Sequence, residues 1–369
     1  MRTALNLRLM MTTDAVGGVW TYATSLAAAL VEMGADVSLV TMGPSPRPDQ
    51  RTMVHGRVHL VETDLALEWQ DPDAADMARA RAALDRLERR LRPDIVHLNS
   101  FREATFEWNA PVLVAAHSCV NSWARACNDN AWLSESRWRR YSELVAAGLS
   151  RAGGWVCASS AYRDMVEEIY HPDHRGAVIW NGLAPATARP RQKQDFILAA
   201  GRMWDKAKNL PVLAHAAKDV NWPVLVAGQN ADLERREGIE LLGELPRAEL
   251  HGLMRRAAIF TSPALYEPFG LSVLEAAAAG CALVLSDIPS FRELWDGAAL
   301  FVSPEDAAGL SAALNCLIRN EAHRSRLQDA ALARSRHYSL TGMVDGYVRL
   351  YGELTRTATR RHLETGACA

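Results

Sequence analysis

Cysteine is scarce in this sequence, and its six cysteines form neither a C-x-x-C pair nor a pattern with metal-ligand spacing. They are therefore expected to be reduced thiols. No run of eighteen apolar residues occurs, and the amino terminus has no long apolar core before a small-residue cleavage site. Neither a membrane-spanning helix nor a secretory signal is expected, so the sequence predicts a cytoplasmic protein.

An excess of charge of one sign is also missing, because the formal net charge is −2. A dedicated nucleic-acid binder needs a basic surface across a whole domain, and this composition does not supply one. The dinucleotide-binding pattern G-x-G-x-x-G is absent from the first strand-to-helix turn, T-T-D-A-V-G-G-V-W. A nicotinamide enzyme therefore lacks its main motif. Gly17 and Gly18 still allow a ligand to approach the backbone closely, and a plain turn is the alternative.

The order of apolar segments predicts an α/β fold with two domains. A chain of 369 residues is long for one core, and its 49% hydrophobic content is typical of a globular protein. Short apolar strands alternate with helical stretches twice, which indicates two parallel sheets covered by helices. The expected strands are Leu7–Met11, Val37–Thr41, Ile95–Leu98, Val112–Ala115, Trp155–Ala158 and Ala177–Ile179, then Phe196–Ala200, Val224–Ala227, Ile239–Leu241, Ile259–Thr261 and Leu283–Leu285. The polar stretch Pro185–Gln194 is expected to link the two domains.

The most informative stretch is Y-E-P-F-G-L-S-V-L-E-A-A-A-A-G, in which seven residues separate Glu267 from Glu275. The Pro-Phe-Gly turn precedes good helix formers, so a helix is expected to begin near Leu271 and to end at Gly280. The free N–H groups and the positive dipole end of such a helix suit a diphosphate. Carboxylates only accept hydrogen bonds, so vicinal hydroxyls suit the two glutamates, whereas solvated surface is the alternative for either one alone.

A second motif, F-I-L-A-A-G-R-M-W-D-K-A-K-N-L, places Arg202 and Lys208 on the loop after an expected strand. Two cations at the carboxyl end of a strand can converge on one diphosphate and stabilise the charge of a leaving group. No metal is then required. Lys206 is the alternative to Lys208 as the phosphate ligand, and an ion pair with Asp205 is the alternative for Arg202.

These two motifs together resemble the donor signature of retaining glycosyltransferases of family 4 (glycosyl transferases group 1), which have the GT-B fold. The resemblance implies two Rossmann-like, doubly wound domains facing across a cleft. It further implies that Glu275 holds the ribose hydroxyls, that Glu267 faces the donor sugar, and that Arg202 and Lys208 grip the phosphates in place of a divalent cation. The amides between the glutamates would hold sugar hydroxyls and phosphate. The full donor-binding set in this stretch is Phe269, Gly270, Leu271, Ser272 and Glu275.

The same resemblance gives roles to residues of the first half. Gly17 or Gly18 would face the donor diphosphate. His117, at the end of the expected strand in V-A-A-H-S, would contact the donor sugar. A structural hydrogen bond is the alternative for His117. His97 also ends a strand, and it either lines the cleft or packs at the sheet edge.

The resemblance also implies the domain limits. Residues 1–183 are expected to form the acceptor-binding domain and residues 184–340 the domain that binds the nucleotide-sugar. In residues 341–369, a helix near Gly342–Leu354 would cross back to the first domain, and the tail from Arg356 is expected to fray. The choice of nucleotide base is expected to depend on the loops Gly228–Asp232 and Leu242–Leu245.

Two basic stretches raise the question of membrane contact. Arg79–Arg92 carries six arginines on an expected helix, and Trp132–Arg140 mixes tryptophan with arginine. Either stretch could lie on anionic lipid at the inner face of the membrane. The alternatives are a solvated helix face for the first and an aromatic acceptor pocket for the second.

The function implied is transfer of a hexose from a nucleoside-diphosphate sugar, with UDP-sugars favoured by family frequency, to a saccharide or lipid-linked acceptor in polysaccharide or glycolipid biosynthesis. Retention of configuration, with the diphosphate taking the acceptor proton, is likewise implied by the resemblance. No metal or other cofactor is expected. A sugar-nucleotide epimerase of the same architecture and a non-catalytic nucleotide-sugar-binding protein remain the alternatives.

Overall fold

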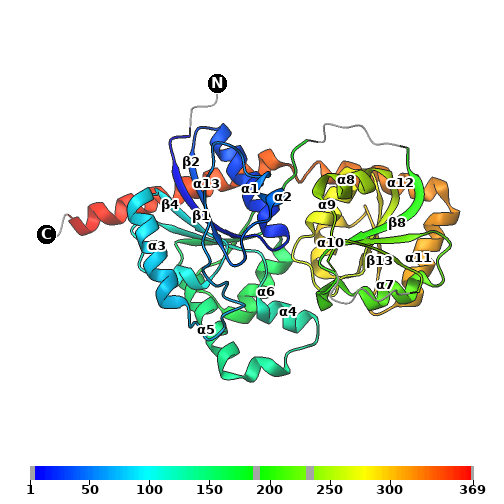
Figure 1. The fold of residues 1–369 in the computed structure, drawn as a ribbon, viewed down its shortest axis with the longest axis horizontal. Coiled ribbons are helices and arrows are strands. Elements are labelled where there is room, and N and C mark those ends of the chain that lie inside the picture. Colours follow the sequence, from blue (N-terminus) through cyan, green and yellow to red (C-terminus); the bar gives the residue numbers. More distant parts are fainter. Residues whose placement is uncertain (1–4, 186–191, 230–236, 367–369) are drawn as a thin grey trace. The chain divides into compact units, whose positions relative to one another are not determined.

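The computed structural model describes residues 5–185, 192–229 and 237–366 (Figure 1). The chain divides into two compact units. Unit 1 contains the residues up to Trp180 together with those from Leu340 onward, and unit 2 contains Asn181–Ser339. We expected domain boundaries after residues 183 and 340, and the two units divide after residues 180 and 339. Most of the expected linker, residues 186–191, lies outside the described residues.

Unit 1 is built on a parallel sheet of seven strands in the order β3-β2-β1-β4-β5-β6-β7. The strands are β1 (Arg8–Asp14), β2 (Asp36–Met42), β3 (His59–Val61), β4 (Ile95–Leu98), β5 (Val112–Ala116), β6 (Gly154–Cys157) and β7 (Ala177–Val178). The strand order reverses between β1 and β4. Open α/β sheets bind ligands at the carboxyl ends of strands at such a point.

The helices of unit 1 connect these strands. They are α1 (Gly18–Glu32), α2 (Pro48–Arg51), α3 (Met77–Leu91), α4 (Val120–Ala126), α5 (Ser136–Arg151) and α6 (Ser160–Tyr170), with 3-10 turns η1 (Arg102–Thr105) and η2 (Ala131–Ser134). The central strands β4 and β5 are buried along their whole length. Their sequences are nearly continuous apolar runs because helices cover both faces of a parallel sheet.

A cluster of buried charges fastens the loop after β3 to η1. The guanidinium of Arg102 is almost fully buried and donates to Glu103 and to Asp71, both at 2.9 Å. Glu68 Oε2 accepts the backbone N–H groups of Phe101 at 3.0 Å and Arg102 at 2.8 Å. Burial, assisted by the Glu103 carboxylate, raises the pKa of Glu68 to about 8.

Replacing Glu68 with glutamine is expected to change how stability depends on pH. Because the folded state raises the pKa of Glu68, the proton on this carboxyl stabilises the fold at low pH, and that contribution is lost as the pH rises through about 8. Glu68→Gln should therefore gain stability relative to the wild type between about pH 5 and pH 9, by on the order of 1–3 kcal/mol. Urea unfolding across this range measures the difference. A difference in unfolding free energy between variant and wild type that stays the same at every pH would contradict the expectation. Glu143→Gln, at an exposed side chain, is the control.

Unit 2 contains a parallel sheet of six strands in the order β10-β9-β8-β11-β12-β13. The strands are β8 (Gln194–Ala200), β9 (Val224–Ala227), β10 (Glu240–Gly243), β11 (Ala257–Ser262), β12 (Ala282–Ser286) and β13 (Leu300–Val302). The order reverses between β8 and β11, so the loops that follow these two strands meet at the same edge of the sheet.

The helices of unit 2 cover this sheet around a core of small and branched apolar residues. They are α7 (Leu210–Ala217), α8 (Arg247–Arg256), α9 (Leu271–Ala278), α10 (Pro289–Trp295), α11 (Ala307–Arg319) and α12 (Glu321–Ser335), with the 3-10 turn η3 (Lys206–Lys208). Helix α9 begins at Leu271, as predicted, and its C-cap is Ala279.

The last helix, α13 (Leu340–Gly366), follows unit 2 in the chain but belongs to unit 1, where it packs against α1 and β4 (Figure 1). The hydroxyl of its Tyr351 lies 2.6 Å from His97 Nδ1, and the Tyr22 hydroxyl lies 3.3 Å from His97 Nε2. This buried polar network ties the returning helix to the sheet.

Several expected elements differ from those observed. The bounds of the expected strands agree with the observed ones to within three residues, but β3 and β13 were not predicted. Both have only three residues, which is too short for a clear apolar pattern. The prediction of a frayed tail from Arg356 was wrong, because α13 continues to Gly366. Within the described residues, none of the helices combines the length and the apolar character needed to cross a bilayer.

Candidate active site

The strand reversal in unit 2 brings together the two motifs singled out in the sequence. The loop after β8 carries Arg202 and Lys208, and the loop after β11 carries Glu267. The backbone N–H of Leu265 donates to the Ala207 carbonyl at 2.8 Å, which joins the two loops directly. Their association therefore follows from the sheet order, in which β8 and β11 are neighbours.

Lys208 forms an ion pair with Glu267. Its Nζ lies 2.5 Å from Glu267 Oε2, and the two side chains are only 17% and 16% exposed. The Ser290 hydroxyl donates to the Glu267 carbonyl at 2.5 Å, which fixes the backbone beneath the carboxylate. Lys206, the alternative to Lys208, is exposed. The structure thus brings Lys208 to the glutamate motif through a partly desolvated ion pair, whose charges are screened less than those of a surface pair.

Arg202 lies on the same loop and remains 41% exposed. Its guanidinium lies 3.1 Å from the buried carboxylate of Asp205 and 5.6 Å from the centre of the Trp204 ring. The ion pair proposed as the alternative for Arg202 is therefore present. It leaves much of the guanidinium in contact with solvent, where it can also meet an anion.

The amino terminus of α9 lies directly after Glu267 in the chain. Its N-cap is Gly270, which has a φ of +87°. The positive φ favours glycine, and a Cβ at this position would be crowded, at 3.0 Å from Phe291 and 3.3 Å from Glu267 Cγ. The first N–H groups of a helix have no partner within it. The amides of Leu271 and Ser272 are therefore available to an anion, while Phe269 is buried against Tyr338.

Glu275, one turn inside α9, has partners on α8 that the sequence analysis missed. Its Oε1 lies 2.8 Å from Arg247 NH2 and 3.3 Å from His251 Nε2, and its side chain is 12% exposed. The spacing of Arg247 and His251, four residues apart, places both on one face of a helix. That spacing was visible in the sequence, but nothing in it indicated that this face would meet Glu275.

In unit 1, Gly17 and Gly18 lie at the carboxyl end of β1. Gly17 is the N-cap of α1 and has a φ of +80°, and Gly18 is the first residue of the helix. A left-handed glycine at this point exposes the helix amino terminus without a side chain in front of it. Both glycines therefore lie at the strand reversal of their own sheet, as Lys208 and Glu267 do in theirs.

His117 follows β5 and is held by Asn99. The Asn99 side chain donates through Nδ2 to the Thr12 carbonyl at 2.6 Å, so its Oδ1 is the acceptor for His117 Nε2 at 2.7 Å. His117 therefore carries its proton on Nε2, and Nδ1 is left as an acceptor. Part of the ring stays exposed, but the surrounding protein desolvates it and lowers the pKa of His117 to about 4. The imidazole is neutral near neutral pH.

His97 has a different environment from His117. It is fully buried between Tyr22 and Tyr351, and burial lowers its pKa to about 3. Of its two predicted roles, packing is therefore the one observed, because no face of the ring reaches solvent.

The basic stretches considered for membrane contact are partly neutralised within unit 1. On α3, Arg79 pairs with Asp76 and Asp64, and Arg89 pairs with Asp85. In the second stretch, Trp132 packs edge-on against Trp138 with ring centres 4.8 Å apart. Membrane contact remains a prediction.

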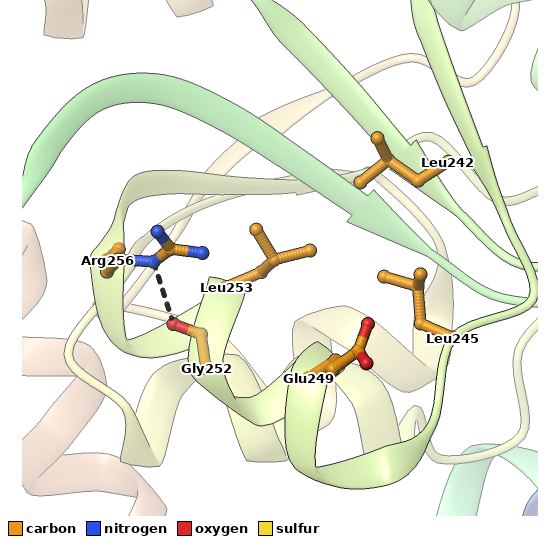
Figure 2. Close-up of a pocket in the computed structure, with 6 residues that line it drawn as sticks. All are labelled: Leu242, Leu245, Glu249, Gly252, Leu253 and Arg256. Atoms are coloured by element: carbon orange, nitrogen blue, oxygen red, sulfur yellow. Dashed lines mark hydrogen bonds between the residues drawn. The ribbon is translucent and has the colours of Figure 1, made fainter.

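A pocket of about 420 Å³ opens on α8 of unit 2 (Figure 2), lined by Leu242, Leu245, Glu249, Gly252, Leu253 and Arg256. The three leucine side chains point toward a common space (Figure 2). With 3.6 residues per turn, positions 249, 253 and 256 lie on the side of α8 opposite to Arg247 and His251. The pocket is therefore separate from the contacts of Glu275. Leu242 and Leu245 belong to one of the two loops expected to meet the base, whereas residues 230–232 of the other such loop lie outside the described residues.

Comparison with known proteins supports the resemblance found in the sequence. A model described as "Glycosyltransferase Family 4" matches residues 16–186, and one described as "Glycosyl transferases group 1" matches residues 194–320. The chain belongs to this glycosyltransferase family. Both models describe transferases, so the enzyme is a glycosyltransferase, and the alternatives of an epimerase or a non-catalytic binder are not favoured.

Several individual proteins are similar to this glycosyltransferase. Glycogen synthase from Mycobacterium tuberculosis is 27% identical over 365 residues, covering 86% of each chain. Phosphatidyl-myo-inositol mannosyltransferase from Mycolicibacterium smegmatis is 31% identical over 170 residues, covering 44% of this chain and 42% of the relative. Sucrose-phosphate synthase from Thermosynechococcus elongatus matches the fold with a TM-score of 0.80 at 16% identity, covering 95% of this chain and all of that one. Anabaena HepE in complex with UDP matches with a TM-score of 0.73 at 14% identity, covering 94% of this chain and 100% of HepE. The fold is therefore GT-B.

Among the described residues, no three side chains of histidine, cysteine, aspartate or glutamate gather closely enough to hold a metal ion. The cationic and amide groups around Lys208 and α9 are donors, which suit an anion instead.

Proposed function

We propose that this glycosyltransferase transfers a hexose, with retention of configuration and without a metal, from a nucleoside-diphosphate sugar to a hydroxyl of a saccharide or lipid-linked acceptor. A UDP-sugar is the favoured donor. The observation that carries the proposal is the meeting of Lys208, Arg202 and the amino terminus of α9 at the strand reversal of unit 2. Two cationic side chains and the first amides of a helix lie there, and all of them are donors that suit a diphosphate.

The leaving group is the chemical problem that these residues address. When the anomeric C–O bond breaks, negative charge grows on the nucleoside diphosphate. Fixed cations stabilise that charge without reorganisation. Lys208 is paired with Glu267, which holds its ammonium group in place at the strand reversal. The N–H groups of Leu271 and Ser272 are proposed to hold phosphate and sugar oxygens, and Glu267 to accept from sugar hydroxyls.

In unit 1, His117 is proposed to accept a hydrogen bond from a hydroxyl of the donor sugar. Its Nδ1 is the free acceptor, because Nε2 donates to Asn99. Desolvation keeps the ring neutral, so Nδ1 stays available as an acceptor at neutral pH.

The choice of donor and acceptor rests on the relatives. HepE has been crystallised with UDP-glucose and TarM with UDP, which supports a uridine nucleotide. Other similar proteins are named for glycogen synthesis, O-antigen mannosyl transfer and mannosyl transfer to phosphatidyl-myo-inositol. These names support a saccharide or lipid-linked acceptor in the assembly of a polysaccharide or glycolipid, with peripheral membrane contact in the lipid-linked case.

Thermal unfolding with UDP, GDP and ADP in the presence of EDTA tests the proposal. A nucleotide at about a hundred times its dissociation constant should add roughly 2.7 kcal/mol to the stability of the unit that binds it. One of the three is expected to raise the melting temperature by several degrees, and Glu275→Ala is expected to abolish the shift. Glu249→Ala, which removes a glutamate from the far side of α8, should keep it. A shift that survives Glu275→Ala, or one that appears only with added metal, would contradict the proposal.

A further inference from the structure

Helix α8 places two nitrogen atoms near one oxygen of the Glu275 carboxylate, and one of them, Arg247 NH2, donates a hydrogen bond to it. Arg247 NH2 lies 2.8 Å from Oε1, and His251 Nε2 lies 3.3 Å from it. The carboxylate is buried except for 12% of the side chain, so little solvent competes for it. Oε1 is the oxygen that contacts α8, so Oε2 can still accept hydrogen bonds from a ligand.

The opposite ends of these two helices are also fastened together. Lys193 Nζ donates to the Met254 carbonyl in the last turn of α8 at 3.2 Å and to the Ala279 carbonyl at the end of α9 at 2.8 Å. Cys281 Sγ adds a contact of 3.1 Å to the Met254 carbonyl. A cation at the carboxyl ends of two helices is stabilised by both dipoles. Because α8 is anchored to the end of α9 here, the backbone of Arg247 is held beside the helix that carries Glu275.

We propose that Arg247 is a positioning residue for ribose recognition. It holds Glu275 by Oε1 so that Oε2 accepts from the ribose hydroxyls of the nucleotide. The inference rests on the proposed function, which gives Glu275 its ribose contact. It adds that the rotamer of this carboxylate is set by α8, an element outside the glutamate motif. Arg247 has this role because its guanidinium donates the hydrogen bond of 2.8 Å, whereas His251 Nε2, at 3.3 Å, has no hydrogen-bond partner among the described residues.

The test compares each nucleoside diphosphate with its 2′,3′-dideoxy form, which lacks the hydroxyls that Glu275 would bind. Calorimetry with UDP, GDP and ADP first identifies the one that the wild type binds. The wild type is expected to bind the ribose form about 10- to 100-fold more tightly, as for hydrogen bonds to a charged group. In Arg247→Ala the ribose form should bind more weakly and the preference should fall below about 3-fold, because the freed carboxylate no longer faces the hydroxyls.

Two further variants make the result decisive. Arg256→Ala removes an arginine from the other side of α8 and should leave the preference unchanged. Arg247→Lys keeps the charge but loses the planar guanidinium, and it should give an intermediate preference, which also covers the case in which Arg247→Ala does not fold. An unchanged or increased preference in the Arg247 variants would overturn the inference. So would a wild type that binds the nucleotide without a preference for ribose. Absence of binding by all three nucleotides would instead overturn the proposed function.

Discussion

Replacing Lys208 with methionine is expected to lower kcat for glycosyl transfer about 10²- to 10³-fold, the usual loss when one preorganised group that stabilises transition-state charge is removed. Methionine keeps most of the side-chain length and apolar contact but has no charge. The substitution also leaves Glu267, whose side chain is only 16% exposed, without its ion-pair partner. The effect should therefore appear in the chemical step, where charge grows on the diphosphate, more than in binding of the intact donor.

Release of nucleoside diphosphate from the sugar nucleotide measures this loss. Lys206→Met is the matched control, because Lys206 lies on the same turn but is exposed. Its activity should stay within about twofold of the wild type, as expected for a surface substitution. If the Lys206 variant lost activity and the Lys208 variant kept it, the assignment of the phosphate ligand would be reversed.

Replacing Gly228 with alanine is expected to destabilise unit 2 by more than about 3 kcal/mol, since backbone strain and steric overlap add. Gly228 has a φ of +137°, and a Cβ there would lie 1.7 Å from the Gly201 carbonyl oxygen. The obstacle is backbone, so no side chain can move aside. Gly201 immediately precedes Arg202. Any shift that relieves the overlap therefore displaces the loop that carries Arg202 and Lys208, and nucleotide binding should be lost along with stability.

Gly297→Ala is the control for this prediction. Gly297 has a φ of +77°, but a Cβ there would meet nothing within 4 Å. Gly297→Ala should therefore lower the free energy of unfolding by only about 1–2 kcal/mol, the effect of placing alanine in a left-handed backbone conformation. Urea unfolding of both variants measures the difference. Equal losses of stability would show that the contact with Gly201 contributes nothing.

The sequence predicted those parts of the fold that local patterns determine. The Pro-Phe-Gly turn predicted the start of α9 at Leu271, and apolar runs predicted buried strands such as β4. The three-residue strands β3 and β13 were missed because they depend on pairing with a neighbour. The length of α13 was also missed, because the residues after Arg356 have no pattern that distinguishes a helix from a frayed tail.

The sequence likewise predicted only part of the candidate site. The motifs around Arg202 and Glu267 were recognisable separately, but the contact of Lys208 with Glu267 depends on β8 and β11 being neighbours, which no local pattern encodes. Arg247 and His251 were missed for the same reason, since they reach Glu275 from another helix. Similarly, the neutral state of His117 follows from its burial, and its tautomer follows from the orientation of Asn99.

The central claim is that Arg202, Lys208 and α9 bind a nucleoside diphosphate without a metal. Calorimetric titration of the wild type with the preferred nucleotide, once with EDTA and once with millimolar Mg²⁺, tests it most directly. The two dissociation constants should agree within about threefold, because the protein supplies the positive charge itself. Binding that is detectable only with Mg²⁺ would contradict the claim.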